Sequence, residues 1–159
     1  VLYGEAGTGL VTDGDQRITA TSLLGGGIAE LRFGIAMATG RFNDNPFDFL
    51  PGRVSLAIGA TFDTVNGEIK AGSVTVIPGS SSGLVPAQAV RFTRSAGLES
   101  GPPVTVDLFG AALAGGDFNN DGTRDLAIGV PYHDEGGVSD TGAVQVLYNS
   151  AFIFRNGFQ

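Results

Sequence analysis

The residues whose types and spacing point most clearly to chemistry lie in one short stretch, DFNNDGTRDL, at positions 117–126. Oxygen-bearing side chains recur at alternate positions, at Asp117, Asn119 and Asp121, and Asp125 follows after a glycine. Calcium takes about six to eight oxygen ligands, so a compact loop must supply several from alternate residues and a backbone carbonyl. The stretch therefore predicts a Ca²⁺ site.

The expected metal ligands are four side chains and one carbonyl group: the side chains of Asp117, Asn119, Asp121 and Asp125, and the carbonyl of Thr123. Carboxylates crowded into one short loop repel one another unless a cation neutralises them. Gly122 stands at the sixth position of the loop. There the chain must turn sharply, and we expect a Cβ to be in the way.

Two other interpretations of the loop are an ordinary surface turn and an EF-hand. Asp, Asn and Gly also dominate ordinary surface turns, but such turns do not need carboxylates in alternation. An EF-hand requires a bidentate Glu at the twelfth position, where this chain has Ile128. It also requires a helix after the loop, whereas residues 126–131 are a short apolar run closed by Gly and Pro. This run predicts a buried strand.

Length and composition indicate one domain with many turns. The chain has 159 residues, 26 of them Gly, and the glycines fall between short apolar runs. A net charge of −7 argues against nucleic acid as the partner, since phosphates require a basic face. No apolar stretch is long enough to span a membrane. The chain has no Cys and no visible signal peptide, so either a leader has been removed or the chain is a fragment.

Internal repeats predict the architecture. FGIAMATGRFNDN from Phe33 matches FGAALAGGDFNND from Phe109, and GSVTVIPGS from Gly72 matches GAVQVLYNS from Gly142. A third, partial copy opens the chain, where VLYGEAGTGL resembles VIPGSSSGL and QRITATS takes the place of AVRFTRS. Strands are expected to begin near Phe33, Val54, Gly72 and Ala89 in the first copy, and near Phe109, Asp125 and Gly142 in the second. Four strands in a repeat of about seventy residues are typical of a β-propeller blade.

The repeats resemble those of FG-GAP proteins, the group that includes the propeller of integrin α subunits. The resemblance covers the chain from Val1 to about Ser150. The matching residues are Phe109-Gly110, Gly116-Asp117, the loop to Asp125 and the GVP at 129–131, with Phe33-Gly34 and the GAT at 59–61 in the first copy. The resemblance implies a seven-bladed propeller as the usual fold, with calcium in loops that join the first two strands of some blades.

We therefore expect an all-β fold of four-stranded antiparallel blades, with about two blades and part of a third in this chain. The expected units are residues 1–32 as a partial blade and connection, 33–100 as a blade with a degenerate loop, 101–150 as a blade with an intact calcium loop, and 151–159 as a tail or docking strand. Because a closed propeller needs more blades, the chain is a segment of a longer propeller, closes a ring with further copies, or stacks into an open assembly.

The first copy departs from the calcium pattern. Arg41 stands where the second copy has Asp117, and Pro46 replaces Gly122. A fixed cation and a proline at these positions predict that this loop binds no calcium, with Arg41 paired to Asp44 or Asp48. The alternative is a rearranged site built from Asp44, Asn45 and Asp48.

No reacting centre is visible, so the chain is expected not to be an enzyme. The lone His133 follows a strand beside Asp134 and Glu135 and is expected to be solvated, and Ser80, Ser81 and Ser82 form a turn without the context of a nucleophile. The leading interpretation is an extracellular, calcium-binding propeller module for adhesion, protein interaction or assembly, since calcium sites of modest affinity stay filled outside cells. Its partner would be a protein, a glycan or further copies of the chain.

Two alternatives stay open. The chain can be an accessory propeller domain of a secreted hydrolase, since FG-GAP repeats also resemble those attached to a phospholipase. It can also be a lectin-like propeller that binds glycans. The absence of Trp weakens the lectin, although Tyr3, Tyr132 and Tyr148 remain for sugar stacking.

Overall fold

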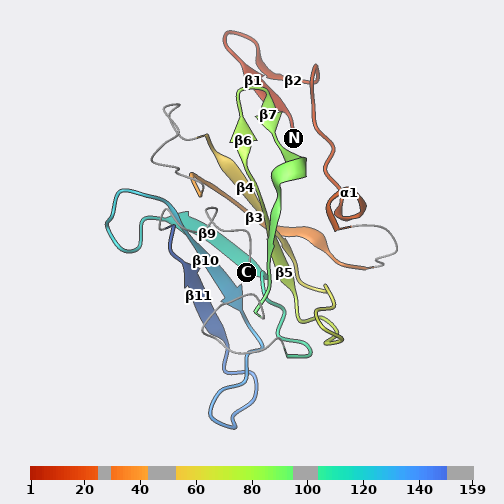
Figure 1. The fold of residues 1–159 in the computed structure, drawn as a ribbon, viewed down its shortest axis with the longest axis vertical. Coiled ribbons are helices and arrows are strands. Elements are labelled where there is room, and N and C mark those ends of the chain that lie inside the picture. The colour runs from red at the N-terminus through yellow and green to blue at the C-terminus, as the bar shows by residue number, and fades with distance from the viewer. Residues whose placement is uncertain (25–29, 43–52, 95–103, 150–159) are drawn as a thin grey trace.

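The computed structural model describes residues 1–24, 30–42, 53–94 and 104–149. Figure 1 shows an elongated molecule built almost wholly from strands, as expected for blades of a propeller. Among these residues the longest helix, α1 (Ala20–Leu24), has five residues, and none is long and apolar enough to cross a membrane.

The first copy forms a complete four-stranded antiparallel blade. Its sheet contains β3 (Phe33–Gly40), β4 (Ser55–Ala60), β5 (Ser73–Ile77) and β8 (Val90–Phe92), in that spatial order. All four strands begin within three residues of the positions predicted from the repeats. A short hairpin of β6 (Gly79–Ser80) and β7 (Gly83–Leu84), followed by a 3-10 turn (Pro86–Gln88), connects β5 to β8.

The second copy supplies a three-stranded antiparallel sheet, with β10 (Asp125–Val130) between β9 (Ala112–Gly116) and β11 (Ala143–Leu147). The pairing register repeats that of the first blade: Leu126 faces Leu147 as Leu56 faces Ile77. The expected docking strand at 151–159 lies outside the described residues.

The partial third copy matches its prediction only at its start. β1 (Tyr3–Glu5) and β2 (Gly9–Val11) form a hairpin that corresponds to β6–β7. The strand expected at QRITATS is wrong, because residues 16–19 carry no strand and α1 begins at Ala20. Val1 and Gln16 exchange backbone hydrogen bonds.

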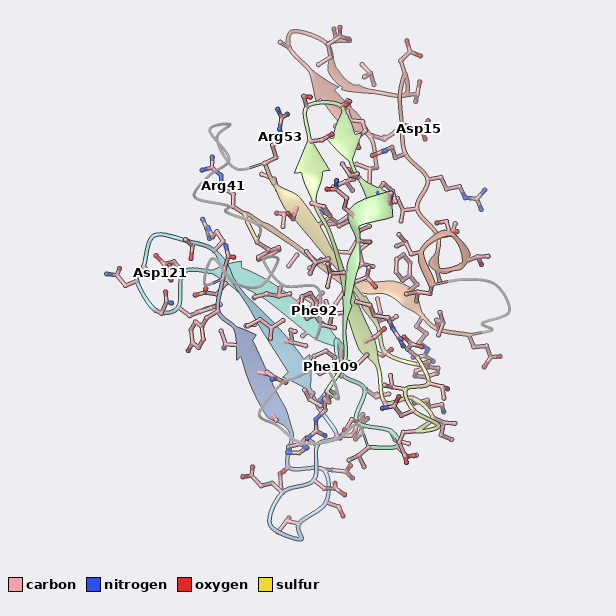
Figure 2. The ribbon with its side chains drawn as sticks, in the orientation of Figure 1. Asp15, Arg41, Arg53, Phe92, Phe109 and Asp121 are labelled. Atoms are coloured by element: carbon pink, nitrogen blue, oxygen red, sulfur yellow. The ribbon has the colours of Figure 1, made fainter. Side chains whose placement is uncertain are left out.

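One apolar core lies between the two blades. Ala57, Val74, Val76 and Phe92 of the first blade pack against Leu126, Ile128 and Val130 of the second, with Phe42 and Phe109 at either end. Phe109 is fully buried, and Figure 2 shows it between the two sheets. Burying the Val, Leu, Ile and Phe side chains among them contributes about 1.5–3 kcal/mol each, which makes the blade interface a main source of stability.

Candidate calcium loop

The loop at residues 117–124 joins β9 to β10, the first two described strands of the second blade, as the resemblance implies. Gly116 and Asp125 are paired across the ladder, so the loop begins and ends at neighbouring positions. Asn120 and Gly122 both adopt positive φ, 59° and 85°. Asn tolerates this conformation by hydrogen bonding locally, and Gly adopts it without steric cost.

The sharp turn at Gly122 is confirmed, but the expected crowding is wrong. Among the described residues, no atom lies within 4 Å of the position that a Cβ on Gly122 would occupy. The glycine is therefore required by its backbone conformation and not by a close neighbour.

The carboxylate of Asp117 holds the first half of the loop. Its Oδ1 accepts a hydrogen bond from the backbone N–H of Asp121 at 3.1 Å, and its Oδ2 accepts one from Gly122 at 3.0 Å. The Oδ1 of Asn119 also accepts from Asp121, at 3.1 Å. The three residues thus share one turn whose oxygens point at the loop backbone.

Asp121 lies at the exposed tip of the loop, which projects from the sheet in Figure 2. The hydroxyl and the backbone N–H of Thr123 both donate to its Oδ1, the latter at 2.8 Å, and Asn119 Nδ2 donates to its Oδ2 at 2.8 Å. These bonds favour the ionised form and lower the pKa of Asp121, with the Thr123 side chain the largest cause and the Thr123 backbone next.

Asp125 is the buried residue among the expected ligands. Its side chain is fully buried at the start of β10, where Oδ2 accepts from the backbone N–H of Phe118 at 2.8 Å. Its Oδ1 accepts from the backbone N–H of Asn149 at 2.9 Å, just beyond β11. Asp125 therefore fastens both the loop and the end of the third strand to the blade.

Asn149 was not predicted, and it links the 117–125 loop to the first copy. Its carbonyl lies 3.0 Å from the Thr123 hydroxyl, and its Nδ2 donates to the carbonyl of Arg41 at 2.9 Å. The two loop regions are thus adjacent in space. The sequence predicted an ion pair between Arg41 and Asp44 or Asp48, or an alternative site at Asp44, Asn45 and Asp48. These three residues lie outside the described part of the chain.

The donor chemistry of the loop suits a hard cation, because every expected ligand is an oxygen. The carboxylate oxygens of Asp117 each accept one hydrogen bond, which leaves a further lone pair on each. The side chains are nevertheless not gathered around one point: in the described part of the chain, no three acidic or histidine side chains form a group that could hold a metal. Asp117 and Asp121 share the turn, whereas Asp125 lies beneath it.

A second polar cluster joins the two blades at the opposite end of β10. Asp107 is buried and pairs with the buried Arg94. The Nδ1 of His133 lies 3.8 Å from Asp107 Oδ1, and the His133 side chain is only 18% exposed. The expected solvated histidine is therefore wrong, because the linker that carries Asp107 covers the imidazole.

The serine and tyrosine candidates have structural surroundings. Ser80 Oγ donates to the carbonyl of Gly83 at 2.8 Å, within its own hairpin. Tyr3 bonds to Gln16, and its hydroxyl accepts from the N–H of Leu84 at 3.0 Å. Tyr132 and Tyr148 are about half exposed, at 47% and 49%. Only these two remain as stacking platforms for a sugar.

A known repeat family matches the second blade, and known proteins are similar to most of the chain. Residues 109–147 match the FG-GAP repeat family. The chain is 34% identical, over 119 residues, to phosphatidylinositol-glycan-specific phospholipase D of Rattus norvegicus. It is 36% identical, over 99 residues, to the Mus musculus protein of the same name. These alignments cover 75% and 62% of this chain but only 13% and 12% of the relatives.

Proposed function

Since this chain carries an FG-GAP repeat in an all-β fold of propeller blades, we propose that it is a non-catalytic propeller module accompanying a secreted hydrolase. The observation that carries the proposal is the similarity to phosphatidylinositol-glycan-specific phospholipase D, which extends over 75% of this chain while the chain spans about an eighth of that enzyme. This similarity favours the accessory domain over the adhesion module that the sequence put first.

The surroundings of the polar side chains support a non-catalytic role. Asp63 is buried and pairs with Ser73 and Arg91, and Asp107 pairs with Arg94. These groups hold loops and strands together, and the hydroxyl of Ser73 is committed to Asp63. A nucleophile beside a base, which covalent catalysis requires, is not found among the described residues.

Two measurements test the accessory function. Purified chain is incubated with vesicles that carry a reporter on a phosphatidylinositol-glycan anchor, and we expect release equal to that from vesicles alone. Release above that background would show catalysis in the chain itself. Separately, the gene is sequenced upstream and downstream of the region that encodes this chain. We expect a hydrolase domain in the same open reading frame. A reading frame without one would overturn the accessory role.

We further propose that the 117–125 loop binds Ca²⁺, which would neutralise its carboxylates and fix the loop at the end of the blade. Asp117, Asn119, Asp121 and Asp125 would supply side-chain oxygens and Thr123 its carbonyl. The chemistry that the ion supplies is structural, because it crosslinks the loop. A ligand that binds only the folded state stabilises it by about 2.7 kcal/mol at a hundredfold excess over Kd.

The calcium site is tested by thermal unfolding in calcium and in chelator. Wild type is expected to melt several degrees higher in calcium, whereas Asp121→Ala is expected to lose the difference. Asp13→Ala is the matched control, because Asp13 is an exposed aspartate outside the loop. Identical melting of the wild type in calcium and in chelator would overturn the site, whatever the outcome of the hydrolase tests.

The cellular location of the chain is inferred from the same comparisons. FG-GAP repeats and the phospholipase relatives favour an extracellular module, and a calcium loop of this type would stay filled there.

A further inference from the structure

The 117–125 loop of the second blade lies beside the end of β3 in the first blade. Just before the loop, a Cβ on Gly115 would be 2.7 Å from the carbonyl oxygen of Thr39. Just beyond β11, the Nδ2 of Asn149 donates to the carbonyl of Arg41 at 2.9 Å. Figure 2 shows Arg41 at the same end of the paired sheets as Asp121. The loop is therefore connected to the first blade through both β9 and β11.

The backbone of Asn149 lies between two of the expected metal ligands. Its N–H donates to the Oδ1 of Asp125 at 2.9 Å, and its carbonyl accepts from the hydroxyl of Thr123 at 3.0 Å. Asn149 and Asp125 are both buried. One buried residue thus contacts the loop through its backbone and the first blade through its side chain.

The apolar packing between the blades is less complete at this end than at the other. At the far end, the backbones of Gly59 and Gly110 are in direct contact. At the loop end a cavity of about 20 Å³ remains, which has room for about one water molecule. Its lining includes Phe42, Phe92, Arg124, Leu126, Leu147 and Asn149. The hydrogen bond from Asn149 to Arg41 therefore joins the blades where their side chains leave a gap.

The expected ligands form a fixed half and an exposed half. Asp125 and Thr123 are tied to Asn149. The exposed half bonds within the loop itself and consists of Asp117, Asn119 and Asp121. An ion that gathers all five ligands would bring the exposed half onto the half that Asn149 already holds.

The first blade has no side chain at the equivalent position. In the alignment of the two repeats Gly79 stands where the second copy has Asn149. A Cβ on Gly79 would lie 2.3 Å from the carbonyl oxygen of Val54, so the position is closed to a larger residue. The asparagine thus accompanies the loop that keeps its expected ligands, and the glycine accompanies the loop in which Arg41 replaces the first of them.

We propose that Asn149 is a positioning residue that couples Ca²⁺ in the 117–125 loop to the contact between the two blades. The hydrogen bond to Arg41 fixes Asn149, and the backbone of Asn149 in turn fixes Asp125 and Thr123 for the ion. Through the same contacts, a bound ion would hold Asn149 against Arg41. This inference rests on the proposed calcium site and adds to it an effect on the neighbouring blade.

Coupling of this kind is reciprocal, because one free energy links the two equilibria. If the contact with Arg41 strengthens calcium binding, calcium strengthens that contact by the same factor. An asparagine that served the fold alone would behave differently, since its loss would lower the stability equally in calcium and in chelator. The calcium affinity and the protection of the blade contact are therefore the two quantities that distinguish coupling from simple support.

Calorimetric titration with Ca²⁺ tests the effect of Asn149 on the loop. Asn149→Ala removes the side chain that reaches Arg41 and keeps the backbone groups that contact Asp125 and Thr123. Its affinity for calcium is expected to be weaker by about fivefold or more. Thr141→Ala is the matched control, because it removes a side-chain hydrogen bond to the carbonyl of His133, 2.8 Å long, at the opposite end of the second blade. It is expected to bind calcium like the wild type.

Hydrogen exchange of the wild type tests the reciprocal effect and does not depend on a variant that folds. Calcium is expected to slow the exchange of backbone amides in the loop and also at the end of β3, around Gly40 and Arg41. The start of β3, at Phe33, is the internal control and is expected to exchange equally with and without calcium. In Asn149→Ala, calcium is expected to protect the loop alone.

The outcomes separate the coupling from the calcium site itself. Wild type that binds calcium but is protected only within the loop would overturn the coupling and leave the site standing. An unchanged affinity in Asn149→Ala, or an equal loss in Thr141→Ala, would also overturn the coupling. Wild type that takes up no calcium in the titration would overturn both the site and the coupling.

Discussion

At the scale of single residues, the three aspartates of the loop have different surroundings. Asp117 and Asp121 accept hydrogen bonds from the loop itself, whereas Asp125 is buried and bonds to Phe118 and Asn149. Buried carboxylates that accept backbone N–H groups fix the segments that carry those groups. We infer that Asp125 shapes the loop without metal, whereas the charge of Asp121 is stabilised by donors of the loop itself.

The hydroxyl of Thr123 is expected to control the pKa of Asp121. Thr123→Val removes the largest cause of the lowered pKa and should raise it toward its ordinary value. The measurement is an NMR titration of the Asp121 carboxyl carbon, with Thr8→Val as control. Because the folded pKa is lowered, Asp121 stabilises the fold above its unfolded pKa, and this contribution disappears as the pH falls through the folded pKa. An Asp121 pKa that does not change in Thr123→Val would contradict the assignment.

The sequence alone predicted the chemistry of the loop but not its partners. Alternating oxygens identify the candidate ligands because the ligand spacing is local. Asn149 could not be predicted as the partner of Asp125 and Arg41, because β11 brings it to the loop from 24 and 108 residues away. Asp107 was not predicted, because nothing in its local sequence identifies its partners Arg94 and His133.

At the scale of elements, repeated sequence gives repeated backbone. The hairpins at 61–72 and 131–142 share their positive-φ positions although few of their residues are identical. Strand positions could therefore be predicted from the repeats, since each pattern was present twice. The prediction failed at residues 16–22, where residues 16–19 carry no strand and a short helix begins at Ala20.

The fit between blades is expected to depend on Gly59. Gly59→Ala would place a Cβ against the carbonyl of Gly110 and is expected to cost about 1–3 kcal/mol of unfolding free energy. Gly129→Ala is the matched control in the other blade, where the Cβ meets only Ala112, at 3.2 Å. It is expected to cost less than about 1 kcal/mol. Urea unfolding measures both, and equal losses would show that the contact between Gly59 and Gly110 is not tightly packed.

At the scale of the whole molecule, two blades share one core and leave two apolar faces open. A closed propeller has no such faces, because each blade covers the next. The first blade shows what coverage does, since Val74, Val76 and Phe42 are all buried by the second blade. Coverage by a neighbouring blade therefore decides which apolar side chains of a blade are buried.

Calcium should then stabilise the molecule through one end of the second blade. The 117–125 loop precedes β10 and the hairpin at residues 131–142 follows it, so the two lie at opposite ends of a six-residue strand, about 17–20 Å apart. Wild type is expected to melt higher in calcium than in chelator, because the ion would bind only folded chains. Val144→Asp changes an exposed side chain of β11 outside the loop and should keep the calcium effect. Differential scanning calorimetry in calcium and in chelator measures both proteins, and a calcium effect that disappears in Val144→Asp would place the ion elsewhere on the molecule.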